Sequence, residues 1–265
     1  MILNNQLVND QITSVQKVAC FLWERGWAER NAGNISINLT ELFLDGEITQ
    51  MESEYLEASL PLESANMVLF FTGKGKRFRD LIAAPERNSC ILQIDSQAKG
   101  YRVIWGEKRS EGFIPTSEFI SHLDIHLFNQ NQVNEHRCVV HTHPTELIAL
   151  SHHPVFGSNE ILLNRALWGM LPEVKMFVPR GIGLVPYLLP GSAQLADATV
   201  IKLKAHDLVL WRKHGVLATG EDAFEAFDFL DVVNKGASIY LKCLQAGFTP
   251  VGLSEEEVKG LDVFL

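Results

Sequence analysis

The hydrophobic positions of the chain repeat at two periods, about 3.6 residues in some stretches and two in others, which predicts helices that alternate with strands. Asn9 or Asp10 can cap a first helix, whose buried stripe has spacings of three and four residues: Ile12, Val15, Ala19, Leu22 and Trp23. Similar spacing predicts helices after Pro115-Thr116-Ser117-Glu118, over 146–151, 158–168 and 192–204, after Asp222, and from a capping box at Ser254.

Short apolar or alternating runs predict strands at 35–39, 67–71, 90–94, 101–105, 138–143, 174–178 and 207–214, and the pair 90–94 and 101–105 should form an antiparallel hairpin. Residues 45–65 are interpreted as a surface excursion and 179–187 as a winding connection. The chain 1–265 is therefore predicted to form one α/β domain, with helices on both faces of a central, largely antiparallel β-sheet.

Composition restricts the partners and the compartment. The 265 residues are 46% hydrophobic, and the formal net charge of −9 argues against nucleic acid or an anionic membrane as the main partner. No apolar run approaches the ~20 residues that span a bilayer, and the first residues lack signal-peptide features, so a cytoplasmic protein is expected. The four cysteines are expected to stay reduced, because they are far apart and form no Cys-x-x-Cys pair: Cys20, Cys90, Cys138 and Cys243.

A candidate metal site begins at the predicted strand 138–143. Because side chains on a strand alternate between its faces, His141 and His143 point the same way, and the proline that follows ends the strand at a rim or cleft. A catalytic zinc normally takes a third protein ligand. The best candidate is His214, which ends another apolar run and precedes Gly215, where a second backbone can approach closely. The alternative is that all three are ordinary packed or loop histidines.

Two turns offer polar groups that can bind an anion. Asn31 and Asn34 flank a glycine, and ordinary turn formation explains them equally well. The turn Thr72-Gly73-Lys74-Gly75-Lys76 follows a buried strand, so its backbone N–H groups and lysines can hold a phosphate. The alternative for this second turn is a solvated basic loop.

The helix after residue 115 carries a rival set of metal ligands. Thr116 or Ser117 is its expected N-cap, which places Glu118 in the first turn and leaves N–H groups for an anion. Glu118, His122 and His126 share one helix face at intervals of four residues. Successive turns separate these side chains by about 6 Å, so we rank them below the strand histidines as ligands of one ion.

In this order, the segments 26–34, 72–76, 115–118, 141–143 and 210–216 resemble the zinc-dependent class II aldolases of the adducin-like family, over nearly the whole chain. The most diagnostic parts are Gly26-Trp27-Ala28-Glu29-Arg30-Asn31 and Pro115-Thr116-Ser117-Glu118. The resemblance implies aldol cleavage of a sugar phosphate by a homotetramer with four-fold symmetry. A different sugar-phosphate aldolase, a 4-epimerase and a metal-free interaction module are the alternatives.

The resemblance also implies roles for particular residues. One zinc ion per subunit would bind to His141, His143 and His214, with Glu118 as the acid/base and a candidate further ligand. The phosphate would be held by a set of turn and helix-start residues: Asn31, Asn34, Gly73, Lys74, Thr116 and Ser117. Glu173 matches a catalytic carboxylate that a neighbouring subunit lends to the site. Lys74 stands where the family has serine, which would make that phosphate contact ionic.

Overall fold

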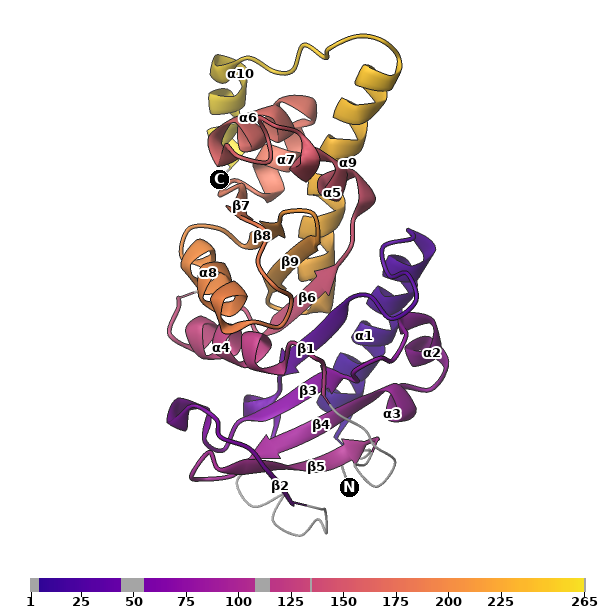
Figure 1. Cartoon of the computed structure of the whole chain (residues 1–265), viewed down its shortest axis with the longest axis vertical. Coiled ribbons are helices and arrows are strands. Elements are labelled where there is room, and N and C mark those ends of the chain that lie inside the picture. Colours follow the sequence, from indigo (N-terminus) through magenta and orange to yellow (C-terminus); the bar gives the residue numbers. More distant parts are fainter. Residues whose placement is uncertain (1–4, 44–54, 108–114, 134, 265) are drawn as a thin grey trace.

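The computed structural model describes residues 5–43, 55–107, 115–133 and 135–264, and the strands among them form one sheet (Figure 1). The sheet order is β2-β5-β4-β3-β1-β6-β9-β8-β7, and neighbouring strands are antiparallel except for β7 and β8. The strands are β1 (Asn34–Asn38), β2 (Tyr55–Glu57), β3 (Val68–Thr72), β4 (Ser89–Ile94), β5 (Gly100–Gly106), β6 (Cys138–Thr142), β7 (Ile182–Val185), β8 (Leu208–Trp211) and β9 (Gly215–Gly220). The predicted α/β class with a largely antiparallel sheet is confirmed.

Helices cover both faces of this sheet, with α4 and α8 on one face and α1 and α9 on the other (Figure 1). The period-two pattern of β1 explains the two cores, because Ile35 and Ile37 pack with α1 and α9 whereas Ser36 faces α4. No described helix is long and apolar enough to cross a membrane. The helices are α1 (Gln6–Glu24), α2 (Phe78–Ala83), α3 (Pro85–Asn88), α4 (Phe119–Gln130), α5 (Thr145–His152), α6 (Glu160–Met170), α7 (Pro172–Phe177), α8 (Ala193–Leu203), α9 (Ala223–Gln245) and α10 (Glu255–Gly260).

The N-terminal part differs from the prediction at two points. α1 is capped by Asn5, whose side-chain oxygen accepts the N–H of Val8 at 3.2 Å, so the predicted start near Asn9 or Asp10 is wrong. The described part of the predicted excursion contains β2, which pairs with β5 at the edge of the sheet. Residues 45–54 lie outside the described residues.

Three assignments in the C-terminal half are corrected. The predicted strand 174–178 is the helix α7, because Pro172 in its first turn has no N–H to lose and already has a helical φ. The predicted connection 179–187 contains β7, whose strand conformation comes from its parallel pairing with β8. The single strand predicted at 207–214 is the first arm of a hairpin, β8 and β9, with His214 in the turn between them.

Two members of the rival set of metal ligands, His122 and His126, form a buried polar contact between α4 and β1. Ser36 Oγ lies 2.7 Å from His122 Nδ1 and 2.7 Å from His126 Nε2. Since the hydroxyl has one proton, it donates to one ring and accepts an N–H from the other, and both rings are neutral. Burial lowers the pKa of each histidine to about 3. These two histidines therefore join α4 to the sheet, and they are not part of the metal-competent cluster found among the described residues.

Replacing Ser36 with alanine is expected to lower the free energy of unfolding by about 1–3 kcal/mol, because two buried ring nitrogens lose their hydrogen-bond partner. Chemical denaturation of the chelator-treated protein measures this loss without a contribution from metal binding. Ser158, whose hydroxyl bonds only to nearby backbone at the surface, provides the control, and its alanine variant should stay within about 0.5 kcal/mol of the wild type. Equal stability of the two variants would contradict the bridging role.

Candidate metal centre and active site

Three histidines meet at the end of β6. His141 belongs to β6, His143 follows its last residue, and His214 lies in the turn between β8 and β9. The ring centroids of His141 and His143 are 5.2 Å apart, and those of His214 are 5.0 and 5.4 Å from them, respectively. The ligand atoms that the three side chains offer all lie within 4.8 Å of one another. The fold thus brings together the trio predicted from the sequence, and this trio can hold one metal ion.

The turn between β8 and β9 presents His214 through a constrained backbone. Lys213 has a positive φ of 61°, a conformation that costs roughly 1–2 kcal/mol for a residue with a side chain. The N–H of Lys213 donates to Ser151 Oγ at 2.8 Å, and the N–H of His214 donates to the carbonyl of Trp211 at 3.0 Å. The Trp211 ring also stacks on His214, with 5.2 Å between ring centroids. These contacts stabilise the turn and restrict the His214 ring.

The protonation states of the histidines suit a bound cation. His141 Nδ1 donates to the carbonyl of Val216 at 3.0 Å, so Nε2 carries the free lone pair. Burial lowers the pKa of His141 well below its ordinary value and that of His214 to about 4. His214 Nδ1 is buried and has no hydrogen-bond partner. Neutral imidazoles with free lone pairs are the form that binds a divalent metal, so the donor set fits.

Replacing Gly215 with alanine is expected to weaken metal binding by at least about tenfold. A Cβ at this position would lie 2.6 Å from the Thr142 carbonyl oxygen, 2.7 Å from His141 Cε1 and 2.8 Å from His143 Cδ2, so ligand rings would have to move. Competition with a metal chelator measures the affinity. Gly260 is the matched control, because a Cβ there meets nothing within 4 Å. Wild-type affinity in the Gly215 variant would show that this close approach is dispensable.

Glu118 is a buried carboxylate near the histidine cluster. Its side chain is only 6% exposed, and Oε2 accepts the Nδ2–H of Asn34 at 2.7 Å. Burial raises the pKa of Glu118, opposed by the Asn34 hydrogen bond and, when His143 is protonated, by the charge of that ring. A carboxyl that retains its proton more readily than a surface glutamate suits a general acid/base.

The start of α4 differs from the prediction. The N-cap is Glu118 itself, not Thr116 or Ser117, and its side chain makes no capping hydrogen bond. A backbone turn precedes the helix, because the N–H of Phe119 donates to the carbonyl of Thr116 at 3.1 Å. Thr116 and Ser117, which were expected to cap the helix, lie in this turn. The Glu118 side chain is hydrogen-bonded to Asn34 instead of capping the helix.

The structure brings the predicted phosphate turn to the start of α4. Gly73 forms an isolated antiparallel bridge with Pro115, so the turn after β3 lies beside Thr116. Thr72 Oγ1 accepts the N–H of Ile35 at 3.0 Å, which ties the same turn to β1. Two segments far apart in the sequence are thereby joined at one place.

The other candidate phosphate residues differ in what they can offer. Asn34 Oδ1 is buried without a hydrogen-bond partner, and Asn31, Lys74 and Ser117 are exposed. The N–H of Gly73 donates to a backbone carbonyl at 2.9 Å and is therefore not free for a ligand. A role for Gly73 would have to come from its small size, which allows close approach.

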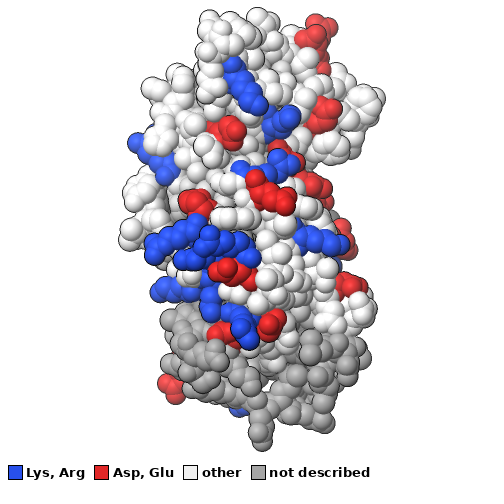
Figure 2. Space-filling view, turned by 90° about the vertical axis from the view of Figure 1, so that its right-hand side faces the viewer, with Lys and Arg blue, Asp and Glu red and all other residues white. Residues whose placement is uncertain are grey.

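Basic side chains gather on the face of the molecule that carries α1 and α2 (Figure 2). The turn after β3 and the start of α2 contribute exposed or partly exposed cations at Lys74, Lys76, Arg77 and Arg79. The chain as a whole has a net charge of −9. The excess of basic side chains on this face is thus local in a chain whose overall charge is negative.

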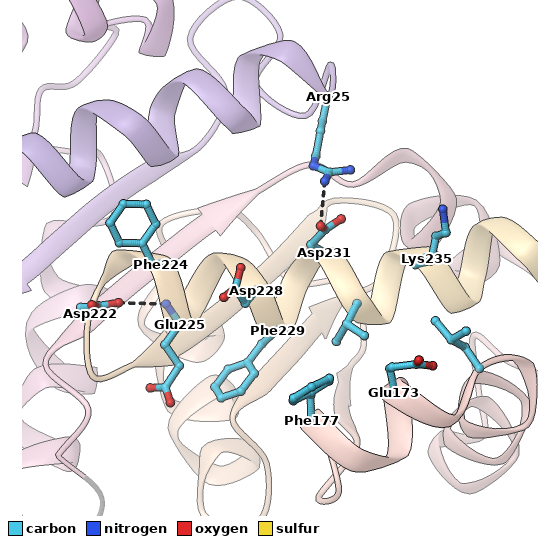
Figure 3. Close-up of a pocket in the computed structure, with 12 residues that line it drawn as sticks. Arg25, Glu173, Phe177, Asp222, Phe224, Glu225, Asp228, Phe229, Asp231 and Lys235 are labelled. Atoms are coloured by element: carbon cyan, nitrogen blue, oxygen red, sulfur yellow. Dashed lines mark hydrogen bonds and ion pairs between the residues drawn. The ribbon is translucent and has the colours of Figure 1, made fainter.

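Glu173 lies apart from the histidine cluster within one chain. It projects from α7 toward α9 and lines a groove of about 740 Å³, to which none of the three cluster histidines contributes (Figure 3). Arg25 and Asp231 form an ion pair of 2.7 Å on the same groove. Among the described residues, Glu173 is therefore not brought together with the predicted metal ligands.

Glu29 contacts the cluster, although no sequence motif predicted a role for it. Glu29 Oε1 lies 2.7 Å from His143 Nδ1. The available signal was the position of this acidic residue inside the segment 26–34, which is one of the diagnostic parts of the resemblance.

The chain matches the family model described as the class II aldolase and adducin N-terminal domain over residues 14–241, and it belongs to this family. It is 41% identical to the rhamnulose-1-phosphate aldolase of Bacteroides thetaiotaomicron, over 98% of this chain and 96% of the relative. It is 36% identical to the rhamnulose-1-phosphate aldolase of Pectobacterium atrosepticum, over 92% of this chain and 89% of the relative.

Solved structures agree with this family. The sugar-phosphate aldolase from Thermotoga maritima aligns with a TM-score of 0.78 at 35% identity, and the match covers 92% of this chain and 99% of that one. An L-fuculose 1-phosphate aldolase aligns with a TM-score of 0.61 at 19% identity, over 95% of this chain and 94% of that one, and thus shares the fold. Family membership and the assembled histidines together identify a metal-dependent class II aldolase.

Proposed function

We propose that this chain is a zinc-dependent aldolase that reversibly cleaves L-rhamnulose 1-phosphate to dihydroxyacetone phosphate and L-lactaldehyde. The observation that carries the proposal is a histidine trio beside the buried Glu118, in a chain 41% identical to a rhamnulose-1-phosphate aldolase. Residues 1–265 would act as one catalytic domain in the cytoplasm, in rhamnose catabolism.

The side chains divide the chemistry between them. His141, His143 and His214 would hold one Zn²⁺ per subunit. Imidazoles are common zinc ligands, and three uncharged ligands would leave the full positive charge on the ion. Zinc supplies Lewis-acid stabilisation of the negative charge that develops when the C3–C4 bond breaks. Glu118 would deliver a proton to C3 of the enediolate of dihydroxyacetone phosphate, which its burial and raised pKa support.

The substrate phosphate would be held where the turn after β3 meets the start of α4. Thr116 follows Pro115, which bridges to Gly73, and the exposed Asn31, Lys74 and Ser117 would complete the phosphate contacts, while the unpartnered buried Oδ1 of Asn34 would face another part of the substrate. Since Oδ1 is an acceptor, Asn34 would serve a hydroxyl of the substrate while its Nδ2 stays with Glu118.

Replacing Lys74 with alanine is expected to raise KM by a few fold, with kcat little changed. The ammonium group is exposed, so its attraction to the phosphate is worth no more than about 1 kcal/mol in water. Initial rates at two salt concentrations measure the effect, which should shrink at high salt because ions screen the contact. Lys99, on the loop before β5, is a control whose alanine variant should keep the wild-type KM. A fall in kcat at unchanged KM would contradict the phosphate role of Lys74.

We also propose that the active enzyme is a homotetramer in which Glu173 of a neighbouring copy serves as the second catalytic carboxylate. Its place on α7, along a groove separate from the histidines, supports a contribution to another subunit. Mixing an inactive Glu173→Gln variant with an inactive His143→Ala variant tests this arrangement. Activity should return in the mixed oligomer, because some sites then receive both groups, and it should stay absent if each chain uses its own Glu173.

The reaction itself is tested by incubating the zinc-loaded protein with L-rhamnulose 1-phosphate and with L-fuculose 1-phosphate, following triose phosphate release. We expect faster release from L-rhamnulose 1-phosphate. Preference for the fuculose compound would favour the other aldolase activity. In a third incubation, with L-ribulose 5-phosphate, formation of its 4-epimer without triose phosphate would indicate an epimerase. A protein without stoichiometric zinc and without turnover would favour the metal-free interaction module.

A further inference from the structure

The carboxylate of Glu29 is directed at a metal-ligand histidine from outside the cluster. Its Oε1 lies 2.7 Å from His143 Nδ1, a distance typical of a charge-assisted hydrogen bond. Because a carboxylate only accepts, Nδ1 of His143 must carry the proton and Nε2 the lone pair. The contact therefore selects the tautomer that can ligate through Nε2.

The segment that carries Glu29 is attached to the end of β6 by the backbone. The carbonyl of Trp27 accepts the N–H of His143 at 2.9 Å and the hydroxyl of Thr142 at 2.7 Å. Gly33 has a φ of +80°, and a Cβ there would lie 2.8 Å from the carbonyl oxygen of His141. These contacts fix the segment against the strand end on both sides of Glu29, so the fold sets the backbone position from which its carboxylate reaches His143.

The three cluster histidines differ in what orients them. His141 donates its Nδ1–H to a neutral backbone carbonyl, that of Val216, at 3.0 Å. Nδ1 of His214 has no hydrogen-bond partner. Among the described hydrogen bonds of the three histidines, only that of His143 is made to a carboxylate.

We propose that Glu29 is a positioning residue of the metal centre, which fixes the ring and tautomer of His143 and adds a negative charge behind the bound cation. A carboxylate that accepts the second ring N–H makes the imidazole a more basic ligand, and loss of such a partner typically costs about 10–100-fold in metal affinity. Glu29 does not touch the substrate or the reacting atoms in this role. The inference rests on the metal site of the proposed function and extends it to a residue outside the ligand set.

The test compares zinc affinity in Glu29→Ala, Glu29→Gln and the wild type by competition with a chromophoric chelator. Glu29→Ala should bind zinc about 10–100-fold more weakly. The zinc affinity of Glu29→Gln should lie between those of Glu29→Ala and the wild type, because the amide oxygen still accepts the Nδ1–H of His143 but carries no charge. Glu24, an exposed carboxylate at the end of α1, is the control, and Glu24→Gln should bind zinc as the wild type does. Wild-type affinity in Glu29→Ala would overturn the proposal.

Two further measurements, the stability of the metal-free variants and the absorption of bound cobalt(II), distinguish a positioning role of Glu29 from a structural one. The metal-free variants should unfold at the same denaturant concentration as the wild type, because the Glu29 side chain is 63% exposed, and a large stability loss would favour a structural role instead. Cobalt(II) in place of zinc should show a changed visible absorption in Glu29→Ala, because the His143 ring is no longer fixed. Stoichiometric zinc without triose phosphate release would overturn the proposed reaction alone, whereas a wild type that takes up no zinc would overturn both.

Discussion

Replacing His143 with alanine is expected to abolish metal binding and aldolase activity together. The variant leaves two imidazoles, and a catalytic zinc normally needs three protein ligands. Without the cation, the charge of the enediolate loses several kcal/mol of stabilisation, so kcat/KM should fall by at least about 10³-fold. Metal analysis of the purified protein and initial rates of triose phosphate release measure the two losses.

The fold should survive this change, because His143 follows the last residue of β6 and is not part of the hydrophobic core. Circular dichroism and the thermal transition of the metal-free protein should therefore match those of the metal-free wild type. His152, an exposed histidine at the end of α5, provides the matched control, and His152→Ala should keep both zinc and activity. Stoichiometric zinc in His143→Ala would show that the metal binds elsewhere.

The metal ligands could be predicted because their arrangement depends largely on local geometry. The period of two along a strand places His141 and His143 on the same face, whatever the rest of the chain does. The choice of His214 depended on the small neighbour Gly215, and the close approach of that glycine to both strand histidines is now visible. Local rules were sufficient where one strand end carries most of the site.

Contacts between segments far apart in the sequence could not be predicted from local sequence patterns. Glu29 and His143 are 114 positions apart, and Asn34 and Glu118 are 84 positions apart, yet each pair forms a hydrogen bond of 2.7 Å. Hydrophobic periodicity indicates which face of an element is buried, but it does not say which other element covers that face. The family resemblance supplied the role of Glu118, and the structure adds the residue that holds it.

The wrong assignments occur where tertiary context decides between helix and strand. The apolar run 174–178 is too short for periodicity to choose, and Pro172 at the helix start favours α7. β7 has four residues between glycine- and proline-rich neighbours, and its conformation depends on hydrogen bonds to β8. Short elements of this kind are defined by their partners more than by their own composition.

Replacing Glu118 with glutamine is expected to lower kcat by about 10²–10⁴-fold, or roughly 3–5 kcal/mol of barrier, while zinc stays bound. Glutamine has nearly the same shape, and its oxygen can still accept the Nδ2–H of Asn34, so the buried contact survives. What is lost is the proton that the carboxyl would transfer to C3. Rates of triose phosphate release and metal content, measured on the same preparation, separate the two properties.

The pH profile gives an independent check on the same residue. Because burial raises the pKa of Glu118, the carboxyl keeps its proton to higher pH than a surface glutamate, and cleavage should decline as the pH rises through that raised pKa. In Glu118→Gln this limb should be absent, since the amide does not titrate in the range. Exchange of solvent deuterium into C3 of dihydroxyacetone phosphate, which needs the proton transfer but no aldehyde, should fall in parallel with cleavage. A variant that loses cleavage but keeps this exchange would move the acid/base role to another residue, because the transfer to C3 would then proceed without Glu118.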